Sequence, residues 1–394
     1  MKLVGIDVGK NSHHFCVMDK ETGEFNVAPS SFSNNKEGFD FLINSLKPYS
    51  KKSILIGMED TGHYHVALLK FLLNNGYTVA LINPKTTDLT RKMEGGITKN
   101  DKLDTITICD VLDTPERKKQ YRITKVDRFD LYEQRQLTRH HHNLKEELNV
   151  YCNRLQKSID LVFPEFNTLF SSKYGAVYMN LLKTFGSAEA IASTDIHTIR
   201  KCFEIKGKGN RISLTPEKLK ECAKNSIGIS SEVETIQIKH LVSQITLIKE
   251  QIAEIDKKIE EFSITNNSPI LSIPGISHFS GTSILAELGD IGNYSKPSQI
   301  IKFAGVAPYH YESSQFNAQH TGITKKGSKY LRKTLYQIIL TVINNNPVFK
   351  KYYLLKISQG KGHRCAQGHC IRKLLRIIYH LLETGQSFDP ALLR

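Results

Sequence analysis

Eight apolar residues in the second half of the chain recur at intervals of three and four positions. They are Ile238, Leu241, Ile245, Ile248, Ile252, Ile255, Ile259 and Phe262. This spacing is that of a coiled-coil seam, and it predicts one long helix over residues 231–263. A looser stripe predicts a second long helix over residues 125–165, formed by Leu137, Leu144, Leu148, Tyr151, Leu155 and Val162. We expect a coiled-coil arm whose partner is the chain itself or another subunit.

The first 112 residues alternate strand and helix patterns. Residues 2–8 predict a buried strand, and residues 15–20 pair with residues 25–28 across a turn at Thr22-Gly23. Further strands are predicted at residues 53–58 and 77–82, and helices at residues 33–45, 66–74 and 102–112. A hairpin followed by alternating strands and helices predicts a mixed sheet flanked by helices.

A length of 394 residues predicts two or three domains. We expect an α/β domain at residues 1–120, a coiled-coil and dimerisation region at residues 121–265, and a helical domain at residues 266–394. The middle region has an inserted helical segment with a Gly- and Lys-rich loop at residues 206–211. The predicted fold class is therefore α/β plus all-α.

The chain has a formal net charge of +15, and most of this charge arises in its last third, where acidic residues are few. Residues 1–112 hold 13 Lys+Arg and 13 Asp+Glu, whereas residues 266–394 hold 16 and 5, a surplus of 11. A basic block attached to a neutral one indicates that one part binds a polyanion while the other does something else. A basic but inert surface is the alternative.

Apolar runs are short throughout the sequence. None approaches the roughly 18–20 residues that span a bilayer, and the first residues lack the apolar core of a secretory signal. Seven cysteines are an odd and sparse number, which disfavours a disulfide framework and fits a reducing cytosol. We expect a cytoplasmic protein with no membrane partner.

The basic domain opens with two short predicted helices over residues 270–289, joined at Ile273-Pro274-Gly275-Ile276. Proline stops the first helix, and glycine permits the turn and a close backbone approach. The second helix then presents N–H groups that can bind phosphate. Such a helix-hairpin-helix is typical of DNA-backbone binding through Pro274 and Gly275. An ordinary helical turn is the alternative.

Four carboxylates have positions that suit a metal site. Asp7 lies within the first predicted strand and Glu59 at the end of the second buried run, while Asp101 and Asp104 share one face of a helix. Such oxygens can bind one or two hard cations, and a cation pair stabilises both oxygens of a phosphoryl displacement. Each acid also has a simpler explanation. Asp7 could cap a turn, Glu59 could be a surface residue, and Asp101 could be an N-cap with Asp104 at N3.

The four acids together, in a hairpin-first α/β order, resemble the ribonuclease-H-like nuclease core. Over nearly the whole chain the sequence resembles the DEDD transposases of insertion sequences, which have a RuvC-like N-terminal domain and a serine-bearing C-terminal domain. The N-terminal motifs that carry the resemblance are GIDVGK (residues 5–10), MEDTGHY (58–64), INP (82–84) and TKNDKLDT (98–105). The C-terminal ones are ILSIPGI (270–276), AELGDIGNY (286–294), KFAGVAP (302–308) and TGITKKGSKYLRKTLYQ (321–337).

The resemblance implies a recombinase that binds Mg²⁺ or Mn²⁺ through Asp7, Glu59, Asp101 and Asp104. It implies donor DNA, target DNA and a bridge RNA as partners, a dimer or tetramer, and nucleoid association in a prokaryote. The family's nucleophilic serine, counted from Pro308, falls on Ser313. The glycine that follows it in the family is replaced here by Ser314, so Ser314 is the alternative nucleophile. From composition alone, both serines are ordinary loop residues.

A basic cluster follows the serines: Lys325, Lys326, Lys329, Arg332 and Lys333. Such a cluster indicates phosphate contacts, with a solvated basic helix as the alternative.

Three other functions compete with the recombinase. A RuvC-like Holliday-junction nuclease would use the four carboxylates and water, without the serine. An actin-like ATPase would need a second phosphate loop and an adenosine motif, which the sequence lacks. A non-catalytic DNA-binding scaffold would not need the carboxylates.

Overall fold

The computed structural model describes residues 1–60, 62–93, 100–114, 123–126, 128–204, 213–309, 312–313, 316–317 and 322–392. The chain forms two compact units. One combines Met1–Arg135 with Asn267–Arg394, and the other is Gln136–Asn266. Among the described residues, no helix is long and apolar enough to cross a membrane.

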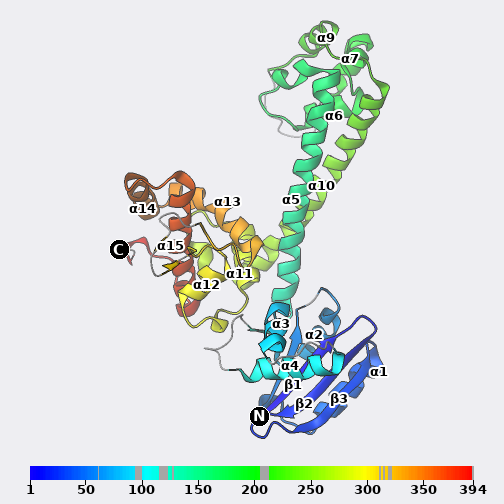
Figure 1. The fold of residues 1–394 in the computed structure, drawn as a ribbon. Helices are drawn as coiled ribbons and strands as arrows, with labels where there is room; N and C mark the ends of the chain where they lie inside the picture. Colours follow the sequence, from blue (N-terminus) through cyan, green and yellow to red (C-terminus); the bar gives the residue numbers. More distant parts are fainter. Residues whose placement is uncertain are drawn as a thin grey trace. The chain divides into compact units, whose positions relative to one another are not determined.

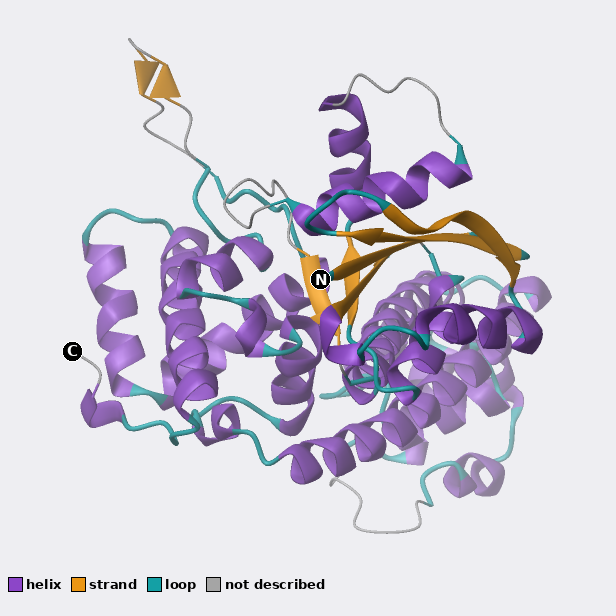
Figure 2. Ribbon diagram, turned by 90° about the horizontal axis from the view of Figure 1, so that it is seen from below, coloured by secondary structure: helices purple, strands orange, loops and turns teal. Residues whose placement is uncertain are grey.

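A six-stranded sheet forms the N-terminal part of the first unit (Figures 1 and 2). Its strands are β1 (Lys2–Val8), β2 (Ser12–Asp19), β3 (Phe25–Ser33), β4 (Ile54–Glu59), β5 (Val79–Ile82) and β6 (Ile123–Val126). Their spatial order is β3-β2-β1-β4-β5-β6. The β1–β4 and β4–β5 pairs are parallel and the other pairs antiparallel, so the sheet is mixed, as the sequence predicts.

Each face of the sheet has its own apolar core. Helices α1 (Lys36–Leu46) and α2 (His65–Asn74) cover one face, where their leucines join the buried side chains of β1 and β4. Helix α4 (Asp101–Asp113) covers the other face and packs on β1. Figure 1 shows α1 and α4 on opposite sides of the strands.

Two glycines let α4 approach the sheet closely. A β-carbon on Gly5 of β1 would lie 2.0 Å from the backbone oxygen of Thr105, and one on Gly57 of β4 would lie 2.9 Å from Leu112 Cδ1. Any larger residue at Gly5 would collide with the helix backbone, which side-chain rotation cannot relieve. The close packing fixes the N-terminus of α4 relative to the ends of β1 and β4.

Several elements differ from the sequence prediction. The hairpin strands are longer than predicted, because β2 begins at Ser12 and β3 continues to Ser33. Helix α3 (Pro84–Met93) and strand β6 were not predicted. The buried residues of α3 are Thr86 and Thr87, so this helix lacks the apolar periodicity that identifies helices in a sequence.

The C-terminal part of the first unit is helical, as predicted. It contains η4 (Pro269–Ser272), α11 (His278–Leu288), η5 (Ile291–Asn293), α12 (Pro297–Phe303), α13 (Lys329–Asn345), α14 (Pro347–Ser358), α15 (His363–Thr384) and η6 (Pro390–Leu392). A short ribbon of β7 (Glu312–Ser313) and β8 (Phe316–Asn317) precedes α13. The core lies around α13 and α15.

The predicted helix-hairpin-helix is only partly formed. The segment before the turn is η4, a 3₁₀ helix of 4 residues, so only α11 is a helix of normal length. Pro269 and Pro274 bracket this segment and leave no room for an α-helix between them. Gly275 adopts a φ of +99° at the turn, and a β-carbon there would lie 2.8 Å from the backbone nitrogen of Val342 in α13.

The second unit contains most of the two long helices, α5 (Asp130–Val162) and α10 (Glu232–Asn266). Figure 1 shows them running alongside each other, and His141 Nε2 of α5 lies 3.1 Å from Asp256 Oδ1 of α10. Short helices connect them: η3 (Pro164–Leu169), α6 (Ala176–Thr184), α7 (Ala188–Ser193), α8 (Ile196–Lys201) and α9 (Pro216–Lys224). The loop at residues 206–211 lies outside the described residues.

The predicted seam of α10 is covered within the chain. Its seven Ile and Leu residues are between 0% and 8% exposed, and Phe262 is half-buried. The N-terminal half of the seam joins Leu155, Ile159 and the helices between α5 and α10 in one core. The apolar spacing is therefore satisfied without a second subunit.

Candidate active site

Asp7 and Glu59 lie side by side at one edge of the sheet. Ile6 of β1 is opposite Met58 of β4 in a parallel pair, so the next residue on each strand is a carboxylate. Parallel strands in register point their paired residues to the same face. This is the face of Gly5 and Gly57, which α4 covers.

Helix α4 brings Asp101 and Asp104 to the same edge. Its N-cap is Asn100, whose side chain accepts a hydrogen bond from the Lys102 N–H at 3.0 Å. The alternative in which Asp101 is the N-cap is therefore wrong. Asp101 is exposed, whereas Asp104 is buried. The positive end of the helix dipole favours both as anions.

All four predicted carboxylates line one open cleft of about 460 Å³. The other residues lining it are Val8, Gly9, Ser12, His14, Pro84, Thr87, Asp88 and Arg91. Asp7, His14 and Asp101 form the tightest group, since one ligand atom from each lies within 4.8 Å of the others. These donors fit a divalent cation, for which carboxylate oxygens and imidazole nitrogens are common ligands.

Helix α3 holds the other two carboxylates. The Thr87 hydroxyl donates a hydrogen bond to Glu59 Oε1, and Arg91 Nη2 lies 2.8 Å from Asp104 Oδ1. A hydrogen bond from Lys92 lowers the pKa of Asp88 on the same helix. Thr87 and Arg91 are one helical turn apart, so α3 contacts the site through a single face.

His14, Thr87 and Arg91 also line the cleft and were not predicted from the sequence. His14 is directly opposite Asp7 in the antiparallel hairpin. The full extent of the hairpin would have revealed it, because facing residues share a face. No sequence pattern pointed to Thr87 and Arg91 as site residues, since helix α3, which carries them, was not predicted.

The predicted serine lies on the β7–β8 ribbon, where Ser313 is paired with Phe316. Backbone hydrogen bonds connect the chain before and after the ribbon. Tyr309 N–H donates to Gly322 O at 2.8 Å, and Thr324 N–H donates to Ala307 O at 2.9 Å. Ser314 lies outside the described residues. The choice of nucleophile stays a prediction.

The basic cluster divides into two kinds of residue. Lys325, Lys326 and Lys329 are exposed, as phosphate contacts require, and Lys333 is half-buried. Arg332 instead donates from Nη1 to the backbone oxygens of Ala304 and Lys325, at 3.3 and 3.2 Å. Its guanidinium thus supports the loop after α12.

The predicted turn also has a mixed environment. Pro274 is exposed and Gly275 half-buried against α13. At the start of α11, Ser277 Oγ accepts the Ser280 N–H at 3.3 Å in a capping box. One N–H that the prediction left for phosphate is therefore already bonded.

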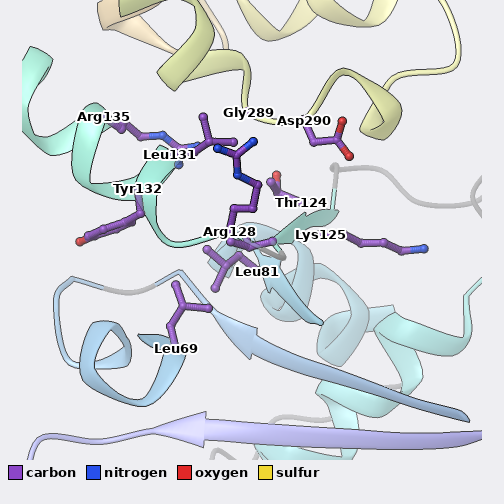
Figure 3. A pocket seen from close by; sticks show the side chains of 11 residues that line it. Leu69, Leu81, Thr124, Lys125, Arg128, Leu131, Tyr132, Arg135, Gly289 and Asp290 are labelled. Carbon is purple, nitrogen blue, oxygen red and sulfur yellow. The ribbon is translucent and has the colours of Figure 1, made fainter. Parts of the chain in front are cut away.

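A second, much smaller pocket lies between β6, the start of α5 and the loop after α11 (Figure 3). It has about 20 Å³, which is room for about one water molecule. Arg135 at its rim donates from Nε to Ala286 O at 2.8 Å, and Asn293 bonds the backbone of Lys125. These hydrogen bonds join the two segments of the unit, and the pocket is too small for a substrate.

A family model described as a transposase, of the DEDD type of IS110 elements, matches residues 4–164. A second model, described as a transposase of the IS116/IS110/IS902 family, matches residues 267–354. The chain belongs to the IS110 family of DEDD transposases. These are enzymes that cleave and rejoin DNA, and the family implies dependence on a divalent metal.

Relatives of this IS110-family transposase include a gene-inverting protein and proteins of insertion elements. The pilin gene-inverting protein of Moraxella lacunata is 21% identical over 389 residues, which cover 98% of this chain and 97% of the relative. The transposase for insertion sequence element IS1111A of Coxiella burnetii is 22% identical over 171 residues, covering 42% and 46%. An uncharacterised 42 kDa protein of IS900 from Mycobacterium paratuberculosis is 26% identical over 175 residues, covering 43% of each.

Proposed function

We propose that this transposase cleaves DNA with divalent cations held by Asp7, Glu59, Asp101 and Asp104, and joins strands through a serine. The observation that carries the proposal is the convergence of the four acids in one cleft, from two strands and one helix. When bound, Mg²⁺ or Mn²⁺ would polarise the scissile phosphate and stabilise charge on the oxygens that attack and leave. The hairpin-first mixed sheet supports a ribonuclease-H-like, RuvC-like core.

The chain's own residues prepare this site. Thr87 orients Glu59, Arg91 holds Asp104, and the packing of α4 on Gly5 fixes Asp101 next to Asp7. Side chains held in place before binding lose little freedom when ligands arrive, which favours catalysis. Arg91 also balances part of the negative charge that would otherwise repel a DNA phosphate.

The proposed nucleophile is Ser313. Its Oγ would form a phosphoester with the scissile phosphorus, and the displaced deoxyribose oxygen would leave and take up a proton. The hydroxyl is a weak nucleophile that needs activation, which a carboxylate of the cleft would supply by taking up the hydroxyl proton. Ser314, the next residue in the sequence, is the alternative nucleophile.

We further propose donor and target DNA as partners, with a bridge RNA as guide. The charge surplus of residues 266–394 and the exposed Lys325, Lys326 and Lys329 support a polyanionic partner. A phosphate contact from a lysine is the same for DNA and RNA. The proposal of an RNA partner therefore rests on the family resemblance.

We also propose that the chain forms a homo-oligomer through the arm made by α5 and α10. The proposed domain boundaries are at residues 120 and 265. Because the seam of α10 is covered within one chain, an oligomer would use the outer surfaces of the arm. Val150 of α5 and Leu247 of α10 are 48% and 55% exposed there and are suited to such a contact.

Two variants test the chemistry on a DNA substrate carrying the element ends. Asp7→Asn should abolish strand cleavage, because it removes a charged cation ligand. Ser313→Ala should abolish the covalent protein–DNA species seen on a denaturing gel, with Ser314→Ala as its control. Cleavage that persists in Ser313→Ala without a covalent species would favour a RuvC-like nuclease. Full transposition by Asp7→Asn would favour a non-catalytic scaffold.

A further inference from the structure

We propose that His14 is a third ligand, beside Asp7 and Asp101, of one divalent-cation site, and that its imidazole makes this site prefer Mn²⁺ to Mg²⁺. The inference rests on the proposed function, because it concerns the same cleft. It adds a nitrogen ligand to a set that the family resemblance describes as four carboxylates.

The hairpin register places His14 on the same side of the sheet as Asp7. His14 of β2 is opposite Asp7 of β1, and facing residues of an antiparallel pair point to the same side of the sheet. Cys16, two residues further along β2, lies 3.6 Å from Cys109 of α4 between their sulfur atoms. His14 therefore shares the face that α4 covers, and it lies near the N-terminus of that helix.

The distances leave space for an ion. His14 Nδ1 is 3.8 Å from Asp101 Oδ2, which is too long for a hydrogen bond. All three ligand atoms lie within 4.8 Å of one another. Two ligand atoms that are each about 2.1 Å from a shared cation can be at most about 4.2 Å apart. The three ligand atoms would therefore need to move closer together by roughly half an ångström to bind one cation.

The donor types determine the selectivity. Mg²⁺ strongly favours oxygen ligands, whereas imidazole nitrogen is a good ligand of first-row transition ions. One nitrogen beside two carboxylates therefore favours a transition ion, for which Mn²⁺ is a suitable probe. Glu59 and Asp104 have oxygen donors only, and they are held by Thr87 and Arg91 in the same cleft.

The test measures ion binding by the full-length, metal-free protein. Free Mn²⁺ is followed by its electron paramagnetic resonance signal, and Mg²⁺ is added as competitor. The native protein should bind Mn²⁺ at least about tenfold more tightly than Mg²⁺. His14→Asn should lose most of that preference, and His14→Asp should restore binding with a preference shifted toward Mg²⁺. His380→Ala, at an exposed position of α15, is the matched control and should behave as the native protein.

The outcomes separate this inference from the proposed function. If Asp7→Asn lowers Mn²⁺ and Mg²⁺ binding but His14→Asn leaves their ratio unchanged, His14 is no ligand and only the inference fails. If Asp7→Asn binds both ions as the native protein does, the carboxylate site itself fails. Melting curves recorded in EDTA identify any variant whose loss of binding reflects misfolding.

Discussion

Arg91 and Asp104 form an ion pair at the wall of the metal-binding cleft, with 2.8 Å between Nη2 and Oδ1. The side chains are 19% and 9% exposed, so little water screens the pair. The guanidinium is thus the resident counter-charge of a carboxylate that we propose as a cation ligand. A cation that binds Asp104 must either join Arg91 or displace it.

Replacing Arg91 should destabilise the fold in the absence of metal. Arg91→Ala leaves Asp104 buried without its counter-charge, which should lower the free energy of unfolding by about 1–3 kcal/mol. Urea unfolding in EDTA measures the loss, and added Mn²⁺ should recover more stability in the variant than in the native protein. The double variant Arg91→Ala, Asp104→Asn should regain part of the loss. Equal stability of Arg91→Ala and the native protein would contradict the role of the pair.

Gly5 should tolerate no side chain. Gly5→Ala places a methyl group 2.0 Å from the Thr105 backbone oxygen, so α4 must move away from β1. We expect a loss of about 1–3 kcal/mol or more, accompanied by weaker Mn²⁺ binding because Asp101 moves with the helix. Gly362→Ala is the matched control, since a β-carbon there meets no atom within 4 Å. Unchanged stability and Mn²⁺ affinity in Gly5→Ala would refute the close packing.

Lys2 should make stability depend on pH at the open end of the hairpin. Its side chain hydrogen-bonds Asp19 across the β1–β2 pair and lowers the pKa of that carboxyl to about 2. A lowered pKa in the folded state stabilises the protein above the unfolded pKa near 3.9, and the contribution disappears as the pH falls toward 2. Lys2→Met should therefore be less stable than the native protein at pH 5, and most of this difference in stability should be lost at pH 2. A difference that persists unchanged at pH 2 would assign the effect to packing.

Neighbouring apolar residues of α10 should respond very differently to truncation. Ile245 is fully buried in the seam, whereas Leu247 is 55% exposed. Within one subunit, Ile245→Ala should cost about 2–5 kcal/mol and Leu247→Ala less than about 0.5 kcal/mol, as measured by denaturant unfolding of the dilute full chain. If the seam served mainly to join subunits, the cost of Ile245→Ala would depend strongly on protein concentration. We expect no such dependence.

The sequence was most informative where burial leaves a periodic pattern. The seam of α10 and the strands that carry Asp7 and Glu59 follow from apolar spacing, because one face of each element is buried. Helix α3 escaped prediction because threonines fill its buried positions. His14 was not predicted as a site residue because its place in the site depends on which residue it faces across the hairpin. The segment before Pro274 was predicted as a helix, although two prolines confine it to a 3₁₀ turn.

Asp101 and Asp104 lie within a single turn of α4, a helix that packs directly on the backbone of β1. Their separation is set by the helix, and their height above the strands is set by Gly5 and Gly57. The backbone positions of these two residues can therefore shift only together. A one-residue insertion before Thr105 would rotate the acids by about 100° relative to the anchored part of the helix. Over evolutionary time, α4 should accept many substitutions on its outward surface and almost no change in length.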